Sequence, residues 1–462
     1  MKVARKSVAL LEYMMIIAFI LNEFSNVMSF YLTGNTDENM RKLISWAITL
    51  LVSAGITCYV MFTWILQKGR DWKRIIISIS PLVFTVLVLM YAIFFHQGEG
   101  FIIKELIWCL LYGAPLVSVA VYSKIKDRLK EIIEKGPGAA LIMMPYYVMA
   151  IAYFWNVKLE TYTGDGYGGL GYLGIGYSAV VLYAFIFAAL LVANKKRKIM
   201  WNSICLIEML ICTWVIVLSG SRGVLIAWAA SSITAVLYSL FRRKWIALTG
   251  NLACVFGVVA LIFLVPSSNA AIIRQFSFVS EVKNGDLGVA MDSQESDRLL
   301  GYIEENAQQG IGMVESANQM FYKDQTNNAV VSITNGSMAR VYLFRLAIEE
   351  GLRSPFKGLG PMGYQVKYKI YPHNIFLEAF ADFGFIGGLM FVVICLWLVF
   401  KFLKFALKDP TWGGLLIIMC THAVRYCFSG NLYLSPMLLF AIAIVCLEKK
   451  HKEISTDLNN VR

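Results

Sequence analysis

Long apolar stretches recur along the whole chain, and they constrain its fold more than any other feature of the sequence. Each stretch has roughly 17–25 mostly apolar residues, the length that a helix needs to cross ~30 Å of hydrocarbon. A transmembrane barrel would instead show alternating segments of ~10 residues, and the sequence contains none. We therefore predict an all-α polytopic membrane protein with about twelve transmembrane helices. They are expected near residues 7–30, 43–66, 75–95, 106–122, 138–155, 170–193, 199–218, 224–241, 245–265, 384–404, 411–429 and 431–447.

The composition excludes two other classes of protein. Apolar residues make up 58% of the chain and charged residues 16%, and the mean hydropathy is +0.62. Soluble domains are closer to half apolar and a quarter charged, so a soluble globular protein is excluded. A disordered chain is excluded as well, because 14% of the residues are aromatic and disordered chains lack such apolar surface.

The net charge of +12 is unevenly distributed between the connections. Lys and Arg gather in alternate connections, as the positive-inside rule requires of the cytosolic side of a membrane protein. Both termini are therefore expected in the cytosol. Basic runs such as 195–198 and 242–244 are interpreted as topology anchors, so no nucleic-acid partner is expected. The predicted cytosolic segments are the N-terminus to residue 6, 67–74, 123–136, 194–198, 242–244, 401–409 and the tail from residue 448.

The nine cysteines indicate neither a disulfide framework nor a metal site. All of them, from Cys58 to Cys446, fall inside apolar segments, and no Cys/His spacing resembles a set of metal ligands. The basic N-terminus precedes a long apolar run without a small-residue cleavage pattern, so we expect a retained first helix rather than a signal peptide. No metal and no cofactor is predicted.

One long connection divides the chain. Residues 1–265 are expected to hold helices 1–9, residues 266–373 a large external loop, residues 374–447 helices 10–12 and residues 448–462 a cytosolic tail. Loops of this length are usually functional or disordered. In the second part of the loop, apolar residues at helical spacing predict a helix over 338–352, which a glycine- and proline-rich turn ends.

Arg222 is the first candidate site residue. It is the charged residue of the turn Ser219-Gly220-Ser221-Arg222-Gly223, between the seventh and eighth predicted helices on the outer side. Glycines allow close backbone approach, and a guanidinium at the membrane–water boundary suits a phosphate or diphosphate. A structural alternative is an arginine that extends from a helix end to the interface.

The second candidate site lies where the long loop returns to the membrane, at Tyr371-Pro372-His373-Asn374. Proline disfavours helix at the preceding residue, so a new helix should begin around His373. An imidazole, with an ordinary pKa of ~6.5, is a credible general base near neutral pH. The helix N-terminus favours its uncharged form. Taken alone, a loop histidine is more often a surface residue.

Four further charged residues complete the candidates. Glu378 and Asp382 follow Asn374 at i+4 and i+8, so they share one face of the predicted helix. Arg340 stands in the first turn of the loop helix, where by itself it is an ordinary solvated charge. Arg425 lies inside the eleventh predicted span, and ionisable residues at membrane depth usually face a cavity or a partner. A structural ion pair is the alternative for Arg425, with Glu12, Glu23 or Glu208 as the partner.

Together these features resemble the O-antigen ligase and polymerase superfamily of bacterial surface-polysaccharide enzymes. One matching feature is the Ser221-Arg222-Gly223 turn, and another is the loop helix that starts at Arg340 and ends in Pro355-Phe356-Lys357-Gly358-Leu359-Gly360. The third is His373-Asn374-x-x-Leu377, followed by Asp382-x-Gly384-x-x-Gly387, in which the family usually has Glu at the position of Asp382.

The resemblance implies a GT-C-like, metal-independent glycosyltransferase of the bacterial inner membrane whose active site faces outward. Its donor would be an oligosaccharide linked to undecaprenyl pyrophosphate. By the family's pattern, Arg222 and Arg340 would bind the pyrophosphate and His373 would activate the acceptor. The remaining candidates for substrate binding are Tyr371, Asn374, Glu378, Asp382 and Arg425.

The resemblance leaves the acceptor open. We expect a polysaccharide polymerase, for O-antigen or capsule, because family members of this size and divergence are more often polymerases. The alternative is a ligase that transfers the glycan to lipid A core. A flippase or transporter is a third possibility, which predicts charged or broken helices at mid-depth. A chain-length regulator and a flippase are the expected protein partners.

Overall fold

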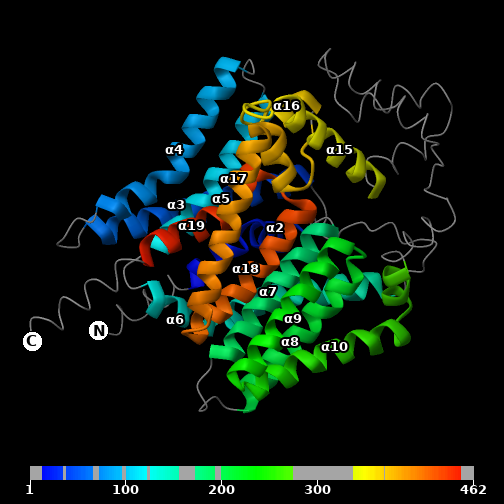
Figure 1. The fold of residues 1–462 in the computed structure, drawn as a ribbon. Helices are drawn as coiled ribbons and strands as arrows, with labels where there is room; N and C mark the ends of the chain where they lie inside the picture. Colours follow the sequence, from blue (N-terminus) through cyan, green and yellow to red (C-terminus); the bar gives the residue numbers. More distant parts are fainter. Residues whose placement is uncertain are drawn as a thin grey trace, which may run out of the picture.

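The chain is described by a computed structural model over residues 13–34, 38–65, 72–95, 100–121, 125–155, 172–192, 199–273, 337–368 and 370–448. Every regular element within these ranges is a helix, which confirms the predicted all-α polytopic membrane fold. Figure 1 shows the helices gathered into one bundle, with α15 and α16 together at one end of it. The helices are α2 (Leu21–Thr33), α3 (Glu38–Ile65), α4 (Trp72–Phe95), α5 (Gly100–Val121), α6 (Ile125–Phe154), α7 (Tyr172–Val192), α8 (Ile199–Leu218), α9 (Arg222–Arg242), α10 (Trp245–Leu264), α15 (Ser337–Arg353), α16 (Gly363–Tyr368), α17 (Ile375–Ala406), α18 (Pro410–Ser429), the short 3₁₀ helix η2 (Leu432–Leu434) and α19 (Pro436–Glu448).

Three of the predicted membrane spans, the first and the last two, differ from the helices in the structure. Within the described residues, α3 to α10 and α17 are long and apolar enough to cross a membrane. The predicted first span is broken, because the helix Tyr13–Phe19 and α2 meet at a bend of 105°. By the same measure α18 is too polar and α19 is too short, so the described chain has nine such helices, or ten with the bent pair, instead of twelve.

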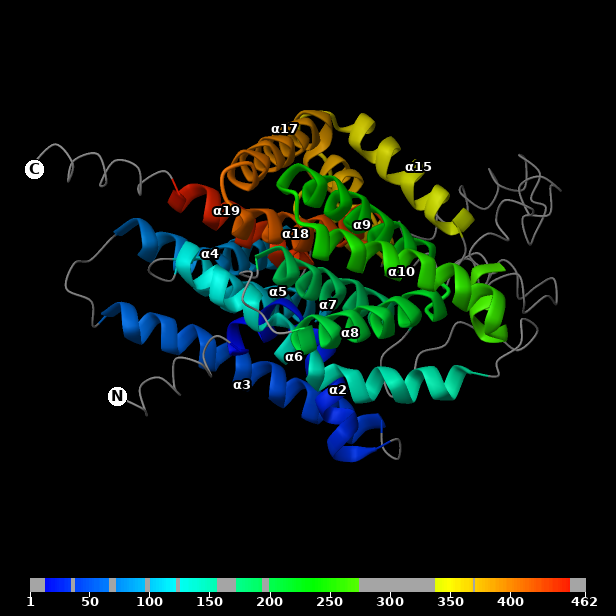
Figure 2. The same ribbon diagram turned by 90° about the horizontal axis from the view of Figure 1, so that it is seen from below.

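Helix α7 occupies the centre of the bundle. Its apolar span is wholly buried, whereas only 17% of the corresponding window of α17 is buried. Figure 2 shows α7 enclosed by α6, α8, α9 and α18, all of which contact it. The outer helices expose large apolar side chains, such as Phe256, Phe263 and Leu396. Because water disfavours so much exposed apolar surface, these faces are suited to lipid.

One predicted boundary is also corrected. Helix α6 begins at Ile125, so most of the predicted cytosolic connection 123–136 forms the first turns of a helix. That stretch is rich in Lys, Glu and Leu, which favour helix. Helix α17 begins at Ile375, close to the start around His373 that the proline predicted, because Asn374 caps it, and it continues through the predicted span 384–404. The predicted loop helix 338–352 is confirmed as α15 (Ser337–Arg353).

A break in α17 positions the loop helices. At Gly384 the backbone leaves helical geometry, with φ 70° and ψ −178°. The helix carbonyls that this break releases accept hydrogen bonds from the preceding turn: Leu359 N donates to Ala381 O at 3.0 Å, and Gly360 N to Asp382 O at 2.8 Å. Buried backbone groups require such partners. The Pro355-to-Gly360 turn is therefore fastened to α17 through the backbone.

Candidate functional site

The C-terminal end of α18 is the place where three candidate segments meet. The Asn374 side chain, just before α17, donates from Nδ2 to the carbonyl oxygen of Cys427 at 3.0 Å. Gly223, at the start of α9, is so close to α7 and α18 that an added Cβ would lie 2.7 Å from Tyr177 Oη and 3.6 Å from Phe428 Cβ. Segments that are distant in the sequence thus bring Arg222, His373 and Arg425 to one end of the bundle.

His373 is held in an uncommon backbone conformation. Its φ is +58°, in the left-handed region that residues with a Cβ adopt at a cost. The next residue, Asn374, caps α17 by accepting hydrogen bonds from Phe376 N and Leu377 N. The imidazole lies against Tyr371, with ring centroids 4.4 Å apart. Strained residues of this kind are concentrated at functional sites, and the helix begins two residues later than the proline alone predicted.

Arg222 opens α9. Ser221 occupies the N-cap position in an extended conformation, and its side chain makes no capping hydrogen bond. Ser221 is buried and Arg222 is half-buried, so the guanidinium starts from the bundle rather than from an exposed loop. A helix N-terminus concentrates N–H donors and the positive end of the helix dipole, both of which attract anions.

Arg425 is placed by two contacts. Its Nη1 atom lies 3.4 Å from Oε1 of Glu23, which settles the partner among the three acids considered from the sequence. Its guanidinium carbon lies 5.0 Å from the centre of the Tyr177 ring. Glu208 makes no hydrogen bond through either carboxylate oxygen, and Glu12 lies outside the described residues. Arg425 retains further donors beyond the one that faces Glu23.

A cavity of about 200 Å³ adjoins Arg425. Its walls come from α2, α5, α18, the segment around η2 and the start of α19. Tyr371 lines it together with Arg425, so the cavity reaches the ring that packs against His373. Glu23, considered from the sequence as a partner of Arg425, forms the opposite wall together with Asn22 and Glu105, which sequence reasoning missed. The signal that could have located this wall is Glu23 itself, an ionisable residue inside an apolar stretch.

Glu378 and Asp382 lie elsewhere. Both are fully buried, and internal hydrogen bonds occupy all four of their carboxylate oxygens. Gln365 and the backbone of Leu432 donate to Glu378, while Tyr433 and the backbone of Tyr364 donate to Asp382. These two candidates therefore fasten α16 and η2 to α17 and do not line the cavity.

The Tyr433 phenol is a necessary part of that network. Its hydroxyl donates to Asp382 Oδ2 at 2.7 Å and accepts from Met362 N at 2.7 Å. Burial, with the nearby carboxyls of Asp382 and Glu378 as a smaller cause, raises the pKa of Tyr433 well above its usual range. The phenol therefore stays protonated and keeps donating, so the network holds α16 in place.

Arg340 is placed only through its helix. It lies in the first turn of α15, and its side chain is outside the described residues. From Leu343 onward α15 is anchored, because the Tyr364 hydroxyl donates to Leu343 O at 2.9 Å and α15 packs along α17.

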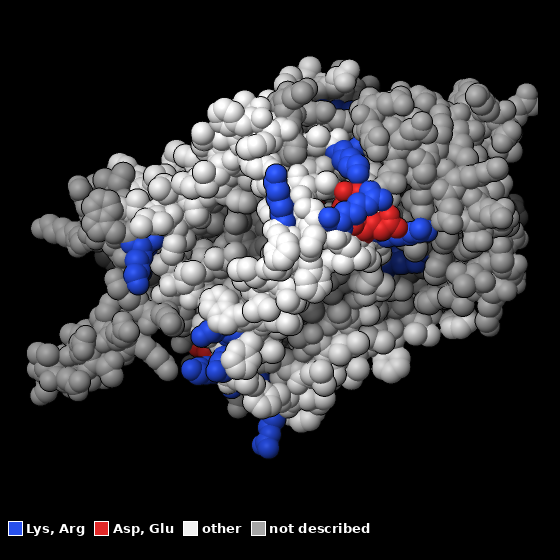
Figure 3. All heavy atoms as spheres, turned by 45° about the horizontal axis from the view of Figure 1, so that its top comes forward, with Lys and Arg blue, Asp and Glu red and all other residues white. Residues whose placement is uncertain are grey.

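The surface near the loop helices carries both signs of charge. On α15, Arg345 pairs with Glu349, and Arg353 with Glu350. Figure 3, which turns the end with α15 and α16 forward, shows basic and acidic side chains side by side and a mainly uncharged surface around them. Because each of these arginines already faces a carboxylate, the half-buried Glu349 or the buried Glu350, the described part of this surface does not form an extended anion-binding patch.

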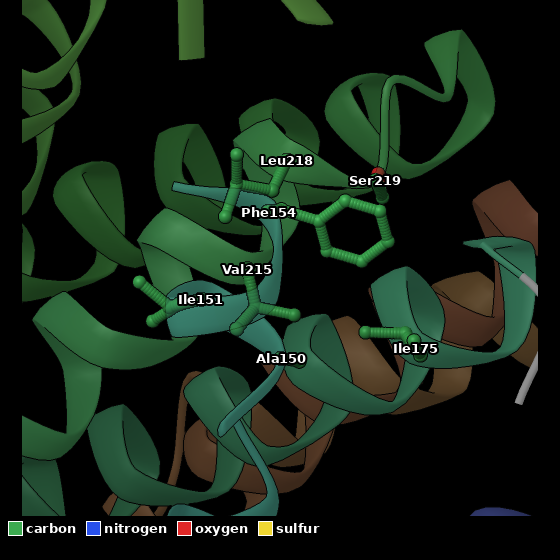
Figure 4. A pocket seen from close by; sticks show the side chains of 7 residues that line it. All are labelled: Ala150, Ile151, Phe154, Ile175, Val215, Leu218 and Ser219. Carbon is green, nitrogen blue, oxygen red and sulfur yellow. The ribbon is translucent and has the colours of Figure 1, made fainter. Parts of the chain in front are cut away.

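An apolar hollow lies beside the Arg222 turn. Figure 4 shows it between α6, α7 and α8, with Phe154 across its centre and Ser219 at its edge. Its free space is about 10 Å³, room for about one water molecule. The lining is apolar apart from Ser219, so this hollow is too small and too apolar for a diphosphate or a sugar.

Comparison with known proteins gives a family match over part of the chain. Residues 207–392 match the O-antigen ligase family model. The match confirms the resemblance inferred from the sequence, and its range includes Arg222, Arg340 and His373. Arg425 and the cavity walls from α2 and α5 lie outside the matched range. No curated protein and no solved structure matches the chain significantly.

Proposed function

We propose that the protein is a membrane glycosyltransferase that polymerises a surface polysaccharide such as O-antigen or capsule. It transfers a glycan from a polyprenyl diphosphate, of the undecaprenyl type, to a sugar hydroxyl of a second lipid-linked repeat unit. The reaction takes place on the outer face of the bacterial inner membrane, and both termini lie in the cytosol. The match to the O-antigen ligase family supports the class of enzyme.

One observation carries the proposal: α9, α17 and α18 present Arg222, His373 and Arg425 at the same end of the bundle. The hydrogen bond from Asn374 to Cys427 O and the close approach of Gly223 to Tyr177 fix this arrangement. Two guanidinium groups and a helix N-terminus supply the donors that a diphosphate requires. Arg340 would add a third guanidinium from α15.

The chemistry assigns each group a separate task. The acceptor hydroxyl attacks the anomeric carbon, the new glycosidic C–O bond forms, and the bond from that carbon to the diphosphate oxygen breaks. His373 takes the hydroxyl proton, and the departing polyprenyl diphosphate takes the electron pair. Arginines at a low-dielectric boundary stabilise the negative charge that grows on this leaving group, the effect expected to dominate.

Substitution of the three motif residues tests the proposal. Arg222→Ala, Arg340→Ala and His373→Ala should each abolish chain extension while the amount of protein in the membrane stays normal. Arg222→Lys should restore only part of the activity, because a point charge replaces a two-pronged donor. Arg345→Ala, on the exposed side of α15, is the matched control and should retain activity. Normal extension by His373→Ala would overturn the assignment of the base.

The acceptor separates a polymerase from a ligase. A strain lacking the gene is examined by gel electrophoresis of its surface glycans. Single repeat units on the cell surface are expected, since existing units would still be transferred but not joined. Long chains that remain on the carrier lipid would instead establish a ligase.

The bend between Tyr13–Phe19 and α2 favours a second candidate function, lipid-linked glycan transport. A broken membrane helix that bears Glu23 is a feature of transporters. Leu21 and Glu23 at this break line the same cavity as Arg425, however, so the break equally serves a headgroup site. Glycan transfer by the purified protein in detergent, where no transport occurs, would decide for the enzyme.

A further inference from the structure

The charge of the cavity beside Arg425 differs from that expected of a diphosphate site. Among the residues that the structure describes, its lining holds two carboxylates, Glu23 and Glu105, and one guanidinium, Arg425. Glu23 already faces that guanidinium at 3.4 Å. An anion inside the cavity would therefore meet a net excess of negative charge, which disfavours its binding. The diphosphate belongs at the rim, toward Arg222, and the interior suits another chemical group.

The polar groups of the interior are suited to a ligand with many hydroxyls. Glu105 accepts a hydrogen bond from Asn431 Nδ2 at 3.3 Å, which leaves further acceptor positions on its carboxylate. Asn22 accepts from the Tyr112 hydroxyl at 3.0 Å. Carboxylates and amides accept hydrogen bonds from sugar hydroxyls, and the Tyr371 and Tyr426 rings in the same lining offer apolar faces.

His422 adds a further polar group to this wall. Its side chain lines the cavity, only 7% of the residue is exposed, and its Nε2 atom has no hydrogen-bond partner among the described residues. A buried polar atom without a partner costs free energy. The imidazole is therefore not needed by the packing of α18, and it leaves this wall polar.

From these observations we infer that the cavity is the subsite for the sugar joined directly to the diphosphate, and that Glu23 and Glu105 restrict it to uncharged, hydroxyl-bearing sugars. The inference rests on the proposed function, because the diphosphate at the rim sets the position of the sugar. Arg425 then lies between Glu23 and the diphosphate. A uronic acid at this position is rejected by the two carboxylates.

Binding to the purified full-length protein in detergent tests the inference with three probes. They are a short-chain polyprenyl diphosphate, its glucose conjugate and its glucuronic acid conjugate. The glucose conjugate should bind about tenfold more tightly than the glucuronic acid conjugate, as expected where an unpaired like charge meets a carboxylate. Glu105→Gln should reduce this ratio severalfold. Glu349→Gln, which removes a half-buried carboxylate of α15, is the matched control and should leave the ratio unchanged.

The outcomes separate the inference from the function on which it rests. Equal affinity of the wild-type protein for both conjugates, or an unchanged ratio in a folded Glu105→Gln variant, would overturn the sugar subsite while bare diphosphate binding still supports the proposed function. Failure of all three probes to bind would overturn both. Because the wild-type comparison alone decides the selectivity, the test does not depend on the variant folding.

Discussion

At the scale of single residues, His373 combines a strained backbone with an imidazole that packs against Tyr371. Its positive φ costs about 1–2 kcal/mol in a residue with a Cβ. Flanking contacts maintain that conformation, because Asn374 caps α17 on one side and Tyr371 packs against the imidazole on the other. Glycine would adopt this backbone conformation at a lower cost, so the histidine lowers the stability of the fold at this position.

The strain at His373 can be separated from its chemistry by comparing two substitutions. His373→Gly relieves the left-handed backbone, whereas His373→Ala keeps the Cβ and the strain. We expect the glycine variant to be more stable than the alanine variant by about 0.5–1 kcal/mol, and both to lose glycan transfer. Thermal unfolding in detergent measures the first quantity and transfer by the purified protein measures the second.

Two results would contradict this account of His373. Equal stability of the glycine and alanine variants would mean that the backbone is not strained in the folded protein. Transfer by the glycine variant at the wild-type rate would mean that the imidazole takes no part in the reaction.

At the scale of helices and turns, helix caps both stabilise the fold and position the site. Asn374 caps α17, and Asp409 caps α18 in the same way by accepting from Thr411 N at 2.8 Å. The Asn374 side chain also reaches across to another helix, at Cys427 O, whereas Asp409 meets α9 through its backbone carbonyl, which accepts from the Tyr238 hydroxyl at 3.4 Å. Asn374→Ala and Asp409→Ala should each lower the free energy of unfolding by about 1 kcal/mol.

Activity should separate these two variants. The transfer rate should fall in Asn374→Ala, because the segment that bears His373 is no longer tied to the end of α18, and it should stay near normal in Asp409→Ala. Transfer assays at a temperature where both variants are folded provide the measurement. An equal loss of rate in both would show that the tie to Cys427 does not position the base.

The backbone junction at Gly384 supports a sharper prediction. An added Cβ there would overlap the carbonyl oxygens of Ser354 and Pro355, while the backbone has a φ of +70°. Gly34 has a comparable φ of +64° with open space around it. Gly34→Ala should therefore cost only the backbone strain of about 1–3 kcal/mol, and Gly384→Ala should cost more and also reduce transfer. Thermal unfolding measures both losses of stability. Equal destabilisation by Gly34→Ala and Gly384→Ala would contradict a rigid junction between the turn and α17.

At the scale of the whole molecule, local patterns predicted the helices but not the way in which distant segments meet. The 3.6-residue pattern around Leu343 was sufficient for α15, because it depends only on neighbours in the sequence. The sequence did not disclose that Glu378 and Asp382 face α16 and η2, since both facing segments are short and irregular. The broken first span was missed as well, because hydropathy averages over a bend. The pairing of Arg425 with Glu23 depends on packing between the two ends of the chain.

The orientation of the molecule in the membrane yields the last prediction. Lys357, in the turn fastened to α17 at the Gly384 break, and Lys408, after the C-terminal end of α17, are both exposed. The part of α17 between the break and Ala406 has about 22 residues and is about 33 Å long, so it separates these positions across ~30 Å of hydrocarbon. In intact bacterial cells, a membrane-impermeant maleimide should label Lys357→Cys, whereas Lys408→Cys should react only after the membrane is opened. The unsubstituted protein, with its native cysteines, sets the background. Labelling in the reverse order would place His373 on the cytosolic side, where a carrier-linked glycan awaiting polymerisation outside the membrane could not reach it.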